Sequence, residues 1–206
     1  MEHGSFWARR LHSLSGVIPI GAFLLEHLFS NSFSARGPEA YNEMVHTLST
    51  LPYVLWLEIF VIFLPILFHA VYGTWIAFQA RYNTVSYPYG RNWMFLLQRV
   101  TGVFLFIYIG LHVWETRLQV YFDESLKLRF FEHMQDLLSN PAYFAFYVAG
   151  VVSAAFHFAN GLWTFGIVWG ITEGRNAQRV ASYACAGLGA VVAGMGIWSL
   201  LGFFQH

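Results

Sequence analysis

The sequence predicts an all-α membrane protein built as a bundle of five transmembrane helices. Of its 206 residues, 57% are hydrophobic and 11% are charged, whereas about 25% of residues are charged in a soluble domain. Five mostly apolar stretches each reach the ~20 residues that cross a hydrocarbon core about 30 Å thick. These stretches are 11–31, 53–79, 92–115, 142–171 and 181–204. The loops between them are too short for a soluble domain, so residues 1–206 are expected to form a single transmembrane domain.

The first stretch is expected to be a retained helix, because no small-residue cleavage site follows it and no Arg- and Ser-rich transit peptide precedes it. Seven of the eleven Lys and Arg residues lie near the N-terminus or around the second and fourth loops. Positive charge favours the cytoplasmic side. The N-terminus is therefore predicted inside and the C-terminus outside, in a prokaryotic cytoplasmic membrane. A net charge of zero gives no indication of nucleic-acid binding.

The second and fourth stretches share the pattern F-H-x-x-x-G-x-W, as FHAVYGTW from residue 68 and FHFANGLW from residue 156. The first and third share another pattern, in which basic residues and a hydroxyl residue precede Gly-Val and an apolar run leads to a histidine. In the first stretch the glycine and histidine are Gly16 and His27, and in the third they are Gly102 and His112. The likeness is too slight to indicate a duplication.

The fifth stretch contains glycines suited to close helix packing and is assigned no chemistry. Its Cys185 is the sole cysteine, which excludes C-x-x-C-H haem attachment, a cysteine-held iron–sulfur cluster and a disulfide framework. The segments GPEAYNEMVHTLST and DESLKLRFFEHMQDLLSNP are expected to form short amphipathic helices at the outer surface, the second ending at Asn140-Pro141.

Four histidines fall at membrane depth, where polar side chains are costly and tend to be functional. Their positions along the stretches suggest two pairs, His27 with His112 in the outer half and His69 with His157 nearer the middle. Facing imidazoles in a bundle suit the axial positions of a haem iron. Zinc would need three or four ligands at one centre, so two b-type haems fit the pattern better. A hydrogen bond to a backbone carbonyl or to a neighbouring hydroxyl remains the plainer alternative for each histidine.

Glycines and donors nearby support this hypothesis. Gly73 and Gly161 follow their histidines by one helical turn and leave a flat surface for a porphyrin, while Gly16 and Gly102 clear space opposite the inner pair. Candidate donors to haem propionates collect at the inner ends of the first and third stretches. They are Arg9, Arg10, His12, Ser13, Arg99 and Thr101.

The whole chain resembles the cytochrome b membrane anchors of succinate:quinone oxidoreductases and fumarate reductases, in the form with one polypeptide, five helices and two haems, and most closely the Bacillus-type b558 branch. The resemblance runs from about residue 5 to residue 180, and the fifth helix matches only in kind. The stretches that carry it are RRLHSLSGVIP, ARGPEAYN, LEIFVIFLP, FHAVYG, RNWMFLLQRVTG, HVWETR and FHFANGLW.

The resemblance implies axial ligation of a distal haem b by His27 and His112 and of a proximal one by His69 and His157. It also implies a respiratory, tricarboxylic-acid-cycle complex, in which an FAD flavoprotein and an iron–sulfur subunit dock on the cytoplasmic face. Electrons would pass from the iron–sulfur subunit through the proximal and then the distal haem to a quinone, usually menaquinone.

Quinone reduction consumes protons, so an exchangeable carboxylate is expected near the outer surface. Glu58 is the first candidate, followed by Glu26 and Glu115, and the alternative for each is an interfacial side chain facing headgroups.

Three other functions remain open from the sequence. The chain could anchor another quinone-linked dehydrogenase, such as a hydrogenase or a formate dehydrogenase. It could be a haem-free proton-coupled transporter, which would show broken half-helices around a site at the membrane midplane. Pro19 and Pro65 are the positions that could break helices in this way, although both lie inside otherwise continuous stretches. A haem-free structural anchor is the third alternative, and four buried histidines argue against it.

Overall fold

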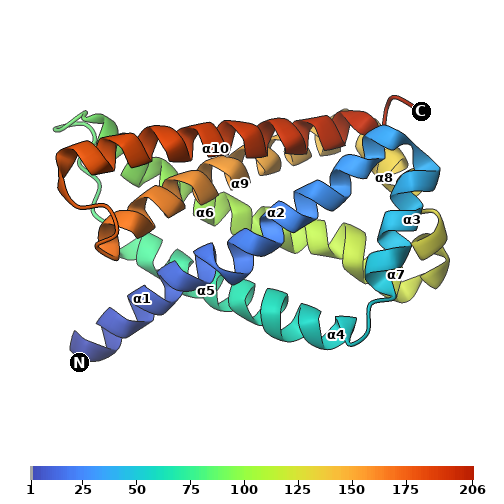
Figure 1. The fold of residues 1–206 in the computed structure, drawn as a ribbon, viewed down its shortest axis with the longest axis horizontal. Helices are drawn as coiled ribbons and strands as arrows, with labels where there is room; N and C mark the ends of the chain where they lie inside the picture. The colour runs from blue at the N-terminus through green and yellow to red at the C-terminus, as the bar shows by residue number, and fades with distance from the viewer. Residues whose placement is uncertain (1) are drawn as a thin grey trace.

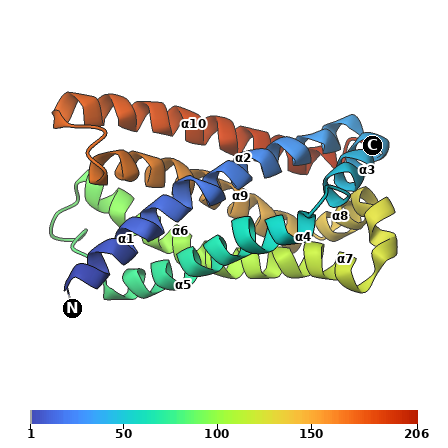
Figure 2. The ribbon, with the colours of Figure 1, turned by 60° about the horizontal axis from the view of Figure 1, so that its bottom comes forward.

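The structure is a computed structural model that describes residues 2–206, and within them it contains helices and no strands (Figures 1 and 2). Five helical segments are long and apolar enough to cross a membrane, as predicted. They span Phe6–Arg36, Val54–Gln79, Gly90–Phe122, Pro141–Val168 and Gly174–Gly202. Because the number of spans is odd, the two ends of the chain lie at opposite ends of the bundle (Figure 1).

The first span consists of α1 (Glu2–Val17), α2 (Pro19–Asn31) and a 3₁₀ turn, η1 (Ser32–Arg36). Proline lacks the N–H that would bond one turn back, and the regular α-helical pattern is broken only at Ile18, directly before Pro19. Hydrogen bonds from Ile18 N to Leu14 O (3.0 Å) and from Ala22 N to Ile18 O (3.2 Å) carry the helix through this point. The span is therefore one continuous helix rather than the two half-helices of a transporter.

The second and third spans each contain a π-helical turn. In the second, η2 (Glu58–Phe63) lies between α4 (Val54–Leu57) and α5 (Leu64–Gln79). Pro65 cannot donate to the carbonyl one turn back, which accounts for the widened turn before it. In the third span, η3 (Trp114–Leu118) joins α6 (Gly90–Val113) to α7 (Gln119–Phe122), and the span continues past the expected end at residue 115.

The fourth span, α9 (Pro141–Val168), has clear signals at both ends. The Asn140 side chain accepts a hydrogen bond from Ala142 N at 2.9 Å as an N-cap. Gly170 has φ +69°, and Ile171 N bonds back to Gly166 O at 2.9 Å, which is the usual geometry of a glycine that ends a helix. The helix therefore ends before the predicted residue 171.

The fifth span, α10 (Gly174–Gly202), begins seven residues before the predicted residue 181. Its first two turns carry Arg175 and Arg179, which lower the hydropathy without disfavouring a helix. Hydropathy therefore predicts only the part of α10 that lies in the membrane, whereas the helix itself begins before that part. Figures 1 and 2 show α10 running along the bundle beside α9.

Two short helices, α3 (Pro38–Ser49) and α8 (Phe130–Ser139), cover the C-terminal end of the bundle together with η4 (Glu124–Leu128) (Figure 1). Both α3 and α8 lie within the segments for which the sequence predicts amphipathic helices. Tyr41, Phe131 and Phe203 are almost fully buried and pack against one another there. Burial raises the pKa of Tyr41 above its ordinary value, so the hydroxyl stays protonated and serves as a donor. This end of the bundle is thus closed by a packed aromatic core.

Candidate functional site

The structure brings His69 of α5 and His157 of α9 face to face in the half of the bundle nearer the N-terminus. Their ring centroids lie 6.2 Å apart, and the ring planes are nearly perpendicular at 80°. These two residues are called the inner pair below.

A second couple, the outer pair, forms nearer the C-terminal end from His27 of α2 and His112 of α6. Its ring centroids lie 5.7 Å apart, also at 80°. The structure therefore groups the four histidines in the two pairs that their positions along the sequence suggest.

Both separations suit two imidazoles bound to opposite sides of one metal ion. A metal–imidazole bond is about 2 Å long and the ring centroid lies about 1 Å behind the nitrogen, so the two centroids should be about 6 Å apart. No group of three or more His, Cys, Asp or Glu side chains converges on a metal-sized point among residues 2–206. The histidine sets fit a haem iron, which needs two protein ligands, and do not fit zinc.

Hydroxyl groups from neighbouring helices orient the inner pair. The Nδ1 of His69 lies 3.0 Å from the His12 carbonyl oxygen and 3.3 Å from Ser15 Oγ. The Nδ1 of His157 lies 3.2 Å from Thr101 Oγ1, and the Thr101 hydroxyl donates to Leu97 O at 2.7 Å. These oxygens are placed to accept from the two Nδ1 atoms, and the tautomer that uses them leaves the lone pair of each Nε2 free for a metal. A ligand histidine whose other nitrogen is held in this way is typical of metal sites.

Two glycines make room for the inner rings. A Cβ on Gly16 would lie 2.5 Å from Cε1 of His69, and one on Gly102 would lie 3.0 Å from Cε1 of His157. Any larger residue would have to displace an imidazole. Each glycine follows the hydroxyl residue that bonds the same histidine, so Ser15-Gly16 serves His69 and Thr101-Gly102 serves His157.

The glycines one turn after the inner histidines do a different job from the flat porphyrin surface that the sequence predicts. A Cβ on Gly73 would lie 2.7 Å from Nε2 of His12, and one on Gly161 would lie 3.5 Å from Nε2 of Gln98. Gly73 thus makes room for His12, whereas the distance at Gly161 would be an ordinary van der Waals contact. Gln98 also donates to the carbonyl of His157 at 3.1 Å and accepts from Asn160 at 2.7 Å.

Among the predicted propionate donors, His12 is the best placed. Its ring stacks on His69 with centroids 4.0 Å apart and planes at 13°, and its Nε2 is buried without a hydrogen-bond partner. Arg99 also has a buried, unpartnered Nε, while its guanidinium lies over Phe95, 3.3 Å from the ring centroid. An acidic group of a bound cofactor would satisfy the Arg99 Nε and, in the tautomer that carries its proton there, the His12 Nε2.

The remaining predicted donors are less well placed. Arg9 is exposed, and Ser13 makes none of the side-chain hydrogen bonds that the structure shows within residues 2–206. Thr101 is engaged with His157. The hydroxyl that meets an inner histidine from α1 is Ser15, which the sequence analysis did not select.

Longer polar contacts surround the outer pair. The Nδ2 of Asn31 lies 3.5 Å and 3.4 Å from the two ring nitrogens of His27, and Oδ1 of Asn31 accepts from the Tyr41 hydroxyl at 2.9 Å. The Nδ1 of His112 lies 3.4 Å from the Tyr147 hydroxyl. These contacts exceed the usual length of a hydrogen bond to nitrogen and hold the rings less firmly.

The two π-helical turns meet through an ion pair. Arg117 in η3 donates to Oε2 of Glu58 in η2 through Nη2 at 2.7 Å and through Nε at 3.1 Å. The side chains of Glu58 and Arg117 are 21% and 35% exposed. Both bonds use Oε2, so Oε1 has no hydrogen-bond partner within the described part of the chain. Single π-helical turns often occur at functional sites.

The other two candidate carboxylates lie elsewhere. Glu26 is exposed on α2 and accepts from Ser30 Oγ. Glu115 accepts from the Tyr143 hydroxyl at 3.4 Å. Neither contacts Glu58 through any hydrogen bond found among residues 2–206, so Glu58 remains the best-placed candidate.

Sequence reasoning missed Ser15, Gln98, Arg117, Asn31 and Tyr147. A signal for the first was present, because the hydroxyl–glycine pair occurs in both the first and the third stretch. The contact between Glu58 and Arg117 joins residues 59 apart, and nothing in the local sequence indicates it.

Comparisons with known proteins show the family to which the sequence is similar. Residues 77–197 match the family described as succinate dehydrogenase/fumarate reductase transmembrane subunit. The chain is also 46% identical, over 198 residues, to the succinate dehydrogenase cytochrome b558 subunit of Bacillus subtilis (strain 168). That similarity covers 96% of each of the two chains.

Proposed function

Since the chain belongs to the family of succinate dehydrogenase/fumarate reductase transmembrane subunits, we propose that it is the di-haem cytochrome b anchor of such a complex. It is a multi-pass membrane protein. Its expected partners are an FAD flavoprotein and an iron–sulfur subunit, bound at the N-terminal end of the bundle. The chain alone oxidises no succinate in this proposal and acts as the part that reacts with quinone.

The observation that carries the proposal is the inner pair with its surroundings. His69 and His157 face each other at the spacing of two axial ligands, and oxygens of other helices lie within hydrogen-bond distance of their Nδ1 atoms. A glycine stands against each ring, so the neighbouring helix comes close enough to hold the imidazole in place. The outer pair repeats the spacing. Together the four histidines would hold two haem b groups.

Haem b at these sites would supply one-electron transfer between the iron–sulfur subunit and a quinone, with menaquinone as the expected acceptor. The chain's own residues would orient the cofactors. His12 and Arg99 offer buried donors for acidic groups, and His27 with His112 sets the second site nearer the C-terminal end.

Glu58 is proposed to exchange protons with the quinone. The arginine partner fixes Oε2, so the carboxylate has a defined orientation and Oε1 is left to bond a quinone oxygen or a water. Arg117 is then a positioning residue. The alternative, an interfacial carboxylate without a role in turnover, makes a different prediction for the variant described below.

The first experiment is haem content per polypeptide in the purified protein, by pyridine haemochrome together with low-temperature EPR of the oxidised form. Two b haems with low-spin bis-imidazole signals are expected. One haem would contradict one of the pairs, and none would contradict the proposal as a whole and favour a haem-free role.

The second experiment replaces Glu58 by Gln, which keeps the shape of the side chain and removes the charge. Quinone reduction should fall while both haem spectra persist. The matched control is Glu124→Gln, because Glu124 forms an exposed ion pair with Lys127 and is 82% exposed. Normal quinone turnover in Glu58→Gln would remove Glu58 from the mechanism without affecting the assignment of the histidines.

A further inference from the structure

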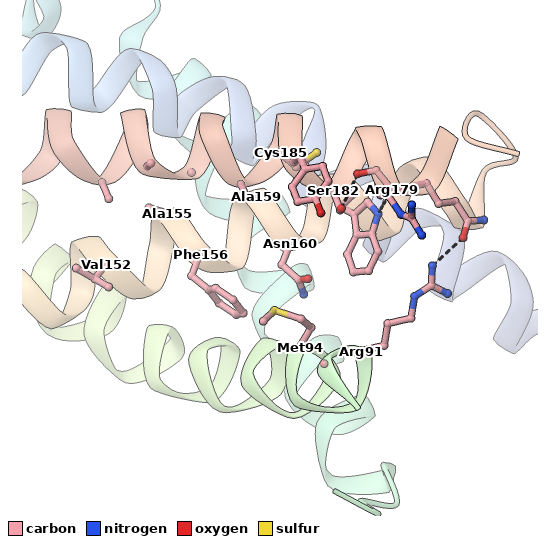
Figure 3. Close-up of a pocket in the computed structure, with 18 of the residues that line it drawn as sticks. Arg91, Met94, Val152, Ala155, Phe156, Ala159, Asn160, Arg179, Ser182 and Cys185 are labelled. Carbon is pink, nitrogen blue, oxygen red and sulfur yellow. Dashed lines mark hydrogen bonds between the residues drawn. The ribbon is translucent and has the colours of Figure 1, made fainter. Parts of the chain in front are cut away.

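A cavity lies apart from the histidines, in a groove between α6, α9 and α10 (Figure 3). Its volume is about 1030 Å³, and none of the four paired histidines lines it. The close-up shows α10 and α9 on either side, with Met94 and Arg91 of α6 at one end. One end of the groove is lined by residues from the first turns of α6 and α10, and this end is called the basic end below.

Most of the groove is apolar. Its walls away from the basic end are made of small and hydrophobic side chains of α9 and α10. They are Val152, Ala155, Phe156, Ala159, Ala186, Gly189, Ala190 and Ala193. From Ser182 to Ala193 the helix rises roughly 16 Å, close to half of a hydrocarbon core about 30 Å thick. The apolar part therefore matches the depth of one membrane leaflet.

Three arginines give the basic end of the groove its charge. Arg91, Arg175 and Arg179 all line it, and none of them belongs to an ion pair among the described residues. The first turns of α6 and α10 contain no acidic residue. The carboxylate nearest in sequence is Glu173, which directly precedes α10. The three arginines therefore enter no ion pair within residues 2–206.

Neighbouring side chains hold part of this end in place. Arg91 Nη2 donates to Gln178 Oε1 at 2.9 Å, and its guanidinium lies 5.4 Å from the centroid of the Trp163 ring. Trp163 Nε1 donates to the carbonyl of Gln178 at 2.9 Å. Tryptophan at such a position is typical of the level of lipid headgroups.

We propose that this groove binds an anionic phospholipid of the leaflet on the N-terminal side, with its acyl chains along α9 and α10 and its phosphate at Arg91, Arg175 and Arg179. Basic pockets between transmembrane helices recognise such headgroups. An uncharged quinone ring leaves the three arginines without a counter-charge. An acidic partner protein could meet the arginines but does not fill an apolar groove one leaflet deep. The inference does not rest on the proposed redox role.

The test uses the complete purified complex, stripped of lipid and titrated with phosphatidylglycerol in native mass spectrometry, with phosphatidylcholine as the neutral lipid. Arg179→Gln should weaken phosphatidylglycerol binding about fivefold, as expected for the loss of one basic residue near a membrane surface. Arg81→Gln is the matched control, since Arg81 is exposed in the loop at the same end and does not line the groove.

A second variant blocks the groove without changing its charge. Ala190→Trp fills the apolar part, and it should abolish the tightly bound phosphatidylglycerol while the complex keeps its subunits. Phosphatidylglycerol binding that is equal in Arg179→Gln and Arg81→Gln would overturn the proposal. So would loss of quinone instead of phospholipid from Ala190→Trp, or loss of the iron–sulfur subunit from Arg179→Gln with lipid binding intact.

Discussion

The inner and outer histidine pairs have similar ring spacings but are held in different ways. At the inner pair, each imidazole ring contacts a hydroxyl group and the glycine that follows it on a neighbouring helix. The surroundings of His69 and of His157 are therefore alike. At the outer pair, the amide of Asn31 meets one ring and the hydroxyl of Tyr147 meets the other, each at 3.4 Å or more. The inner rings thus have closer polar partners, down to 3.0 Å, and a glycine beside each ring, whereas the outer rings have only the longer polar contacts.

The largest effect is expected from removing an inner ligand. His69→Ala should eliminate haem from the inner pair and block assembly with the partner subunits, because the facing His157 then lacks its counterpart. Haem content and low-temperature EPR measure this. His46→Ala, on the exposed surface of α3, should change neither. A His69→Ala protein that retained two bis-histidine spectra would rule out the assignment of the inner pair.

The next effect concerns the space beside the inner ring. Gly16→Ala places a methyl group 2.5 Å from the His69 ring, and such overpacking costs about 1–3 kcal/mol. The EPR signal of the inner haem should shift, and the melting temperature should fall. Gly194→Ala is the control, because a Cβ there meets nothing within 4 Å. Identical behaviour of the two variants would show that the inner ring is not held tightly.

A smaller effect is expected from the hydroxyl that orients His157. Thr101→Val keeps the shape of the side chain and removes the acceptor for Nδ1, so haem affinity at the inner pair should fall about tenfold or more. Redox titration should show one midpoint potential shifted and the other constant. Thr164→Val removes a hydroxyl that bonds only its own helix, at Asn160 and Gly161, and should shift neither potential.

The smallest effect is expected at the outer pair. Tyr147→Phe removes a hydroxyl 3.4 Å from His112 Nδ1, a contact too long to contribute much. The potential of the outer haem should move less than that of the inner haem does in Thr101→Val. A larger shift in Tyr147→Phe than in Thr101→Val would contradict the comparison between the two pairs. Tyr143→Phe is the control, because the Tyr143 hydroxyl contacts Glu115 instead.

Most of the architecture could be predicted from hydropathy, since each apolar stretch corresponds to a span. The ends could not. Polar residues such as Arg175 and Arg179 remain helical outside the membrane, so α10 begins at Gly174. The π-helical turns could not be predicted either. A proline follows η2, but a proline in a helix does not by itself indicate a π-helical turn, and η3 contains no proline at all.

For the candidate site, the four histidines could be found from the sequence because a polar residue in an apolar stretch is conspicuous. Their surroundings could not be found, since they depend on which helix faces which. Ser13 and Ser15 look alike in the sequence, and only the rotation of α1 places Ser15 beside His69. Likewise, Arg117 reaches Glu58 only because two π-helical turns lie side by side.

The repeated arrangement at the inner pair has a consequence for protein design. One membrane helix supplies H-x-x-x-G, and its neighbour supplies a hydroxyl residue followed by glycine. Two copies of this two-helix unit, related by a rotation, would reproduce both sides of the site. A symmetric peptide assembly built from a single such sequence could therefore be made and compared with the natural chain, without the outer pair, the covering helices or α10.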